Sequence, residues 1–139
     1  MAALGGHIQL ASANFAFLEQ HDPQLVRLAG WAERYFPSDP NGCLIKLRMF
    51  GELLATLLAA RYRMLVPDES QTERLRRFRE SDAVPREILT LFHSLRQARN
   101  QAVHDFSDEH SAALSALKHA RALAIWYHKT ISGDRRFSP

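Results

Sequence analysis

Hydrophobic positions recur every three or four residues along most of the chain, which is the spacing of amphipathic helices. The pattern predicts four long helices, over residues 23–36, 40–64, 85–104 and 108–131. It shows no alternation of period two, as strands would, and no repeat of fixed length. We therefore predict an all-α protein built on a four-helix up-and-down bundle.

Start and stop signals support these helices. Asp22 and Asp39 each precede a proline, so their carboxylates can cap the free N–H groups of a helix that begins there. Ser107 or Asp108 would cap the last helix, and Gly133 would end it. Gly51 lies inside the second helix and costs about 1 kcal/mol relative to alanine, which is acceptable if a neighbouring helix packs closely there.

The domain organisation follows from the same pattern. Residues 1–13 are rich in glycine and alanine and are predicted to be a flexible leader. Residues 14–132 would form the bundle, and residues 133–139 a linker or the end of an expressed fragment. Residues 69–80 contain many arginines and few apolar anchors, so we predict a short peripheral helix there.

Composition narrows the class of protein. A chain of 139 residues is long enough for one domain with a buried core. Cys43 is the single cysteine, which excludes a disulfide framework, and no apolar run reaches the roughly 20 residues of a membrane span. No signal peptide is recognisable, so a cytoplasmic protein without membrane contact is expected. The histidine spacing predicts no metal site, and no cofactor motif is present.

Arginine makes up 15 of the 18 basic residues, in a chain of net charge +3. Guanidinium groups bind phosphate with two parallel hydrogen bonds, where lysine acts as a point charge. Two interpretations of the arginine cluster remain open: a solvated face paired with Glu69, Glu73 and Glu80, or a contact surface for the phosphate backbone of RNA or DNA. The nucleic-acid interpretation assigns the contact to Arg74, Arg76, Arg77, Arg79 and Arg96.

The third long helix carries most of the candidate chemistry. Arg96, Asn100 and His104 follow at i, i+4 and i+8 and would form one polar stripe. Arg99 and His104 diverge by about 140° on a helix, so only a long, bending arginine or a fraying helix end brings both to one ligand. Arg48 and Glu52 would form a surface ion pair or flank this motif.

The spacing Arg99-x4-His104 resembles the Arg-x4–6-His signature of HEPN domains, whose active members are metal-independent ribonucleases. Further segments look like one family, the HEPN-type helical domain at the N-terminus of type I restriction endonuclease R (motor) subunits: 14–18, 43–48 with Glu52, 85–88, 91–100 with His104, and 124–128. In that family the domain precedes a nuclease and a motor. This sequence has neither the Walker loop nor the nuclease core, so the chain would be an excised domain or a stand-alone relative.

Two functions are consistent with these residues. The resemblance implies an assembly module of an anti-phage restriction system, with other subunits as partners and nucleic acid as a further one. The alternative is a metal-independent endoribonuclease in which His104 moves a proton and Arg99 stabilises charge on the phosphate, with Asn100 beside them. Asn100 and His104 could instead simply cap the helix end. HEPN-type domains commonly pair around a shared cleft, which implies a homodimer.

Overall fold

The computed structural model describes residues 12–104 and 108–139, with side chains described at all of these except 101–104. Within this part of the chain the structure contains five α-helices and no strand, so the all-α prediction is confirmed. A 3₁₀ turn η1 (Ala16–Leu18) comes first, followed by the helices α2 (Pro23–Tyr35), α3 (Pro40–Arg61), α4 (Gln71–Glu80), α5 (Arg86–His104) and α6 (Glu109–Ser132).

The helix starts are set by the side chains that the sequence indicated. Asp22 Oδ1 accepts a hydrogen bond from the Gln24 N–H at 2.8 Å, and Asp39 Oδ1 accepts one from the Gly42 N–H at 2.9 Å. Asp108 caps α6, and Gly133 ends it with a φ of 77°, a left-handed conformation that glycine adopts without strain.

The end of α3 differs from the prediction. The apolar pattern continues to Met64, but the helix ends at Arg61 because Arg63 takes a left-handed φ of 59°. The Met64 N–H then bonds to the Ala59 carbonyl at 2.8 Å, the closing bond of a Schellman turn. Met64 is therefore directed out of the helix and towards α4, where its sulfur lies 4.0 Å from the Ser81 hydroxyl.

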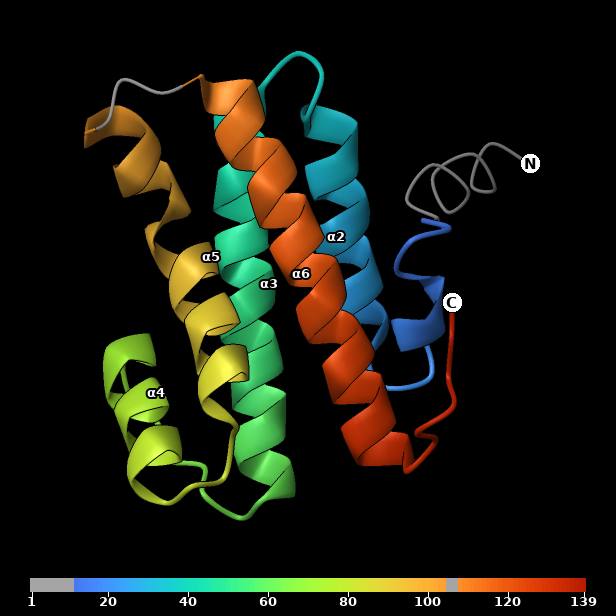
Figure 1. Cartoon of the computed structure of the whole chain (residues 1–139), viewed down its shortest axis with the longest axis vertical. Helices are drawn as coiled ribbons and strands as arrows, with labels where there is room; N and C mark the ends of the chain where they lie inside the picture. The colour runs from blue at the N-terminus through green and yellow to red at the C-terminus, as the bar shows by residue number, and fades with distance from the viewer. Residues whose placement is uncertain (1–11, 105–107) are drawn as a thin grey trace.

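Helix α3 is the centre of the structure and packs against α2, α4, α5 and α6. In Figure 1 the long helices α2, α3, α5 and α6 run side by side, and α4 lies beside the lower half of α5. Buried leucines, alanines and phenylalanines lie on several faces of α3, so it can contact neighbours all round: Leu44, Leu47, Phe50, Leu54, Ala55, Leu58 and Ala59. On α6 small side chains face the core, and Ala113, Ala120 and Ala124 are fully buried.

As expected from the sequence, a neighbouring helix packs closely against Gly51. A Cβ atom built on Gly51 would lie 3.3 Å from Leu95 Cδ1, which shows that α3 and α5 approach closely at this point. Leu95 is itself buried, at 2% exposure. Glycine at this position lowers the helix propensity of α3 but allows a close contact between two helices.

Two contacts hold chain segments that are distant in sequence. The His21 Nε2 and His128 Nδ1 atoms lie 2.8 Å apart and join the segment before α2 to the C-terminal part of α6. Phe17 and Phe137 both pack against the His128 ring, with ring centroids 5.6 Å and 4.2 Å away. At the other end of the molecule, a His110 ring nitrogen lies 3.0 Å from the Pro37 carbonyl oxygen in the turn between α2 and α3.

Candidate functional site

Helix α5 presents the motif side chains at its C-terminal end. Arg99 and Asn100 are exposed, and His104 is the last residue of the helix, with a side chain outside the described part. Arg99 Nε donates a hydrogen bond of 2.9 Å to Asn41 Oδ1, in the first turn of α3. Asn41 is not among the residues that the sequence pattern indicated. The order of α3 and α5 could have suggested it, because antiparallel neighbours bring the start of one beside the end of the other.

A polar hollow of about 420 Å³ lies among α3, α4 and α5. It brings Arg48, Glu52 and Arg96 together, whereas Arg99 does not line it. The remaining lining residues come from α4 and from the segment before it: Glu69, Ser70, Gln71, Thr72 and Arg74. Arg48 Nε and Glu52 Oε2 lie 3.6 Å apart, and both side chains are largely exposed, so the pair itself adds little stability.

The arginines of α4 do not form one surface. Arg74 is only 7% exposed: it donates to Thr56 Oγ1 at 2.9 Å and to the Val66 carbonyl at 3.3 Å. Its Nε lies 3.4 Å from Glu69 Oε1, an ion pair without the alignment of a hydrogen bond. Arg77 donates to the same carboxylate at 2.9 Å and 3.0 Å. Glu69 is thus shared by two guanidinium groups.

The other two arginines face solvent. Arg76 forms an ion pair with Glu73 one turn earlier, and Arg79 is exposed. The pairing of Glu69 and Glu73 with arginines follows the solvated-face interpretation in part, but Arg74 is buried rather than solvated. A signal for this was present in the sequence: Arg74 precedes Leu75 by one position and Phe78 by four, so it lies on the inward arc of the helix. Both apolar residues are buried.

Histidine and cysteine environments limit the chemistry of this region. Burial, followed by the charges of Arg96 and Arg79, lowers the pKa of His93, so its imidazole is neutral near pH 7. Burial, with Glu33 and Asp39 nearby, raises the pKa of the Cys43 thiol to about 12, which excludes a thiolate nucleophile there. Within the described residues, no three His, Cys, Asp or Glu side chains are grouped so as to hold a metal ion.

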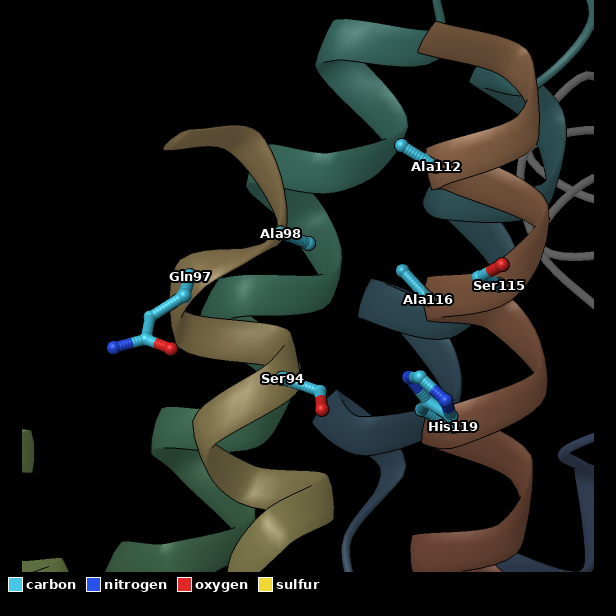
Figure 2. A pocket seen from close by; sticks show the side chains of 7 residues that line it. All are labelled: Ser94, Gln97, Ala98, Ala112, Ser115, Ala116 and His119. Atoms are coloured by element: carbon cyan, nitrogen blue, oxygen red, sulfur yellow. The ribbon is translucent and has the colours of Figure 1, made fainter. Parts of the chain in front are cut away.

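A second groove, of about 340 Å³, runs between α5 and α6. Figure 2 shows Ser94 and His119 facing one another across it, with Ala98, Ala112 and Ala116 along its walls, while the Gln97 side chain points away from α6. The small side chains explain the hollow, because they leave space between two helices that are in contact elsewhere.

None of the helices in the described ranges has the length and apolar character needed to cross a membrane.

The fold and the arginine-lined hollow define an all-helical domain with a polar site beside its central helix. Over 125 residues the chain is 37% identical to the "Type I restriction enzyme EcoKI endonuclease subunit" of Escherichia coli (strain K12). The similarity covers 90% of this chain but only 11% of that subunit, so the chain spans about a ninth of the length of this relative. No family model and no solved structure matches the chain.

Proposed function

We propose that the chain is a HEPN-like four-helix up-and-down bundle that acts in the cytoplasm as an assembly module of a bacterial anti-phage restriction system. The observation that carries this proposal is the 37% identity to the EcoKI endonuclease subunit across 90% of the chain. The four long helices and the placement of Arg99 and Asn100 at the end of α5 support it. The module works without a metal or cofactor, and its partners are the other subunits of the restriction enzyme.

Assembly can be tested by mixing the chain with the separately purified other subunits of a type I restriction enzyme. Co-migration in size-exclusion chromatography, with a mass that includes this chain, is the expected result. Free migration of the chain at concentrations of tens of micromolar would contradict a role in assembly.

We also propose that the chain forms a homodimer through the face of α3 next to the motif. Ile45 and Met49 are 40% and 42% exposed and follow Asn41 at i+4 and i+8, so the three share one stripe. Because Asn41 binds Arg99, a two-fold contact over this stripe would bring two copies of the motif towards one cleft. Light scattering should give a dimeric mass that Met49→Glu reduces to that of a monomer. Leu114→Glu changes an equally exposed residue of α6 and should leave the dimer intact.

The second candidate function is a metal-independent endoribonuclease that uses Arg99, Asn100 and His104. It is favoured by the exposure of Arg99 and by the hydrogen bond to Asn41, which holds the Nε atom of the Arg99 guanidinium group. We expect cleavage of RNA in the presence of EDTA, reduced about 10²-fold by His104→Ala with the melting temperature unchanged. If His104 only caps the helix, the same change should lower stability by about 1 kcal/mol and activity only in step with the folded fraction.

A further inference from the structure

The polar hollow among α3, α4 and α5 contains buried polar atoms without partners. In the described part of the chain, Gln71 Oε1, Arg74 Nε and Arg96 Nε are buried and make no hydrogen bond, and all three residues line this hollow. Unpaired buried polar atoms are rare in folded proteins unless an ordered water or a bound group pairs with them. Arg74 Nε is already in the ion pair with Glu69, so Gln71 Oε1 and Arg96 Nε are the two atoms left unpaired around this hollow, and they indicate a site for a polar group.

The charges around the hollow favour an anion. Arg48, Arg74 and Arg96 line it, against the two carboxylates of Glu52 and Glu69. Glu69 is already shared by Arg74 and Arg77, and Glu52 lies only loosely against Arg48, at 3.6 Å. Arg96 forms no ion pair or hydrogen bond with any described residue. The hollow therefore holds one half-buried guanidinium, with its Nε shielded from solvent, whose charge is not matched by an ion pair.

The start of α4 adds to this positive potential. Ser70, Gln71 and Thr72 line the hollow, and Ser70 Oγ accepts the Glu73 N–H at 3.1 Å as the N-cap of the ten-residue helix. The first N–H groups of a helix have no intrahelical acceptor and lie at the positive end of its dipole. A helix start next to arginine side chains is an arrangement that binds phosphate.

We infer that this hollow binds a phosphate group, held by Arg96 and Arg48 and by the first turn of α4. Phosphate oxygens would accept hydrogen bonds from both guanidinium groups, and a hydroxyl beside the phosphate would donate to Gln71 Oε1. The phosphate could come from a nucleic-acid backbone or from the free ion. The first source rests on the nucleic-acid contact expected from the sequence and on the endoribonuclease candidate, whereas binding of the phosphate group itself does not.

The test uses two probes, inorganic phosphate in isothermal titration calorimetry and a fluorescently labelled single-stranded oligonucleotide, RNA or DNA, in anisotropy titrations at several salt concentrations. Arg96→Gln should weaken both interactions about tenfold and should reduce the slope of log K against log salt by about one. Arg27→Gln is the matched control, since Arg27 is an exposed arginine of α2, a helix that does not line the hollow. It should change phosphate binding less than twofold.

A variant that gains affinity guards against misfolding as an explanation. Glu52→Gln removes a carboxylate from the hollow and should tighten phosphate binding several-fold, which an unfolded protein could not do. Phosphate binding that depends on Arg96, with no effect on the oligonucleotide, would leave the free ion as the ligand and overturn the nucleic-acid source. Equal behaviour of Arg96→Gln and Arg27→Gln towards phosphate would overturn the site, whatever the assembly experiment shows.

Discussion

Individual arginines in this protein have opposite roles although they are close in sequence. Arg74 and Arg77 are used to hold the segment between α3 and α4, since Arg77 donates to the Met64 carbonyl at 2.8 Å and Arg74 donates to that of Val66. Arg76 and Arg79 remain at the surface. Arginine content alone predicted a cluster, but only the positions of Leu75 and Phe78 reveal which arginines turn inward. Outside the hollow, a phosphate contact by arginine side chains of α4 is therefore expected from Arg76 and Arg79.

The shared carboxylate gives a prediction for a single residue. Glu69→Gln removes the charge that faces Arg74, in a pair whose side chains are 7% and 8% exposed. Because a buried guanidinium is then left without its counter-charge, the free energy of unfolding should fall by about 3 kcal/mol, as measured by urea denaturation. Glu73→Gln removes an exposed partner of Arg76 and should cost less than about 0.5 kcal/mol. Equal losses in the two variants would contradict this account.

At the scale of elements, hydrophobic spacing and capping residues were sufficient to place the helices. The starts of α2 and α3 follow from an aspartate before a proline, and the end of α6 follows from Gly133. The end of α3 could not be predicted in this way, because Arg63 takes a left-handed conformation that its residue type does not favour. The hydrogen bond between Arg99 and Asn41, 58 residues apart, depends on tertiary packing and was equally beyond the pattern.

The contact between α3 and α5 gives a prediction at this scale. Gly51→Ala should gain helix propensity of about 1 kcal/mol, but its Cβ would lie 3.3 Å from Leu95 Cδ1 and force that side chain to shift. In a Leu95→Ala background the obstacle is gone and the full gain should appear. A double-mutant cycle measured by chemical denaturation should thus show a coupling of at least about 0.5 kcal/mol. The same effect of Gly51→Ala in both backgrounds would show that the two helices are not in tight contact there.

At the scale of the whole molecule, the two ends of the described chain meet at a pair of histidines. His128 is buried, and burial, then His128 and Arg61, lower the pKa of His21. A lowered histidine pKa means that the unfolded chain binds the proton more strongly. The contribution of neutral His21 to the free energy of unfolding is fully present above about pH 6.5, the ordinary histidine pKa. It is lost as the pH falls towards the lower pKa of the folded state.

The expected result is a lower midpoint of urea denaturation at pH 5 than at pH 7.5. His21→Gln should reduce that difference, because the glutamine cannot take up a proton. His93→Gln should act in the same direction, since the pKa of His93 is also lowered, by burial and by two arginines. The two substitutions should add, because they lie in separate parts of the molecule. A denaturation midpoint that is independent of pH in this range would rule out a contribution from either group.

Two hydrogen bonds tie the start of α3 and the turn before it to α5 and α6, at the end of the molecule that carries the motif. They bear on how easily the first turn of α3 opens. The Arg99 contact with the Asn41 side chain and the His110 contact with the Pro37 carbonyl oxygen are both exposed, and each is worth about 1 kcal/mol. Leu54 and Leu58, further along α3, are fully buried in the core. The first turn of α3 buries Cys43, but it lies at a helix end and should open at a lower free energy than the segment around Leu54. In native-state hydrogen exchange, the Cys43 amide, which donates to the Asp39 carbonyl at 3.1 Å, should exchange well before that of Leu54, so a ligand that binds Arg99 would slow exchange selectively at this end.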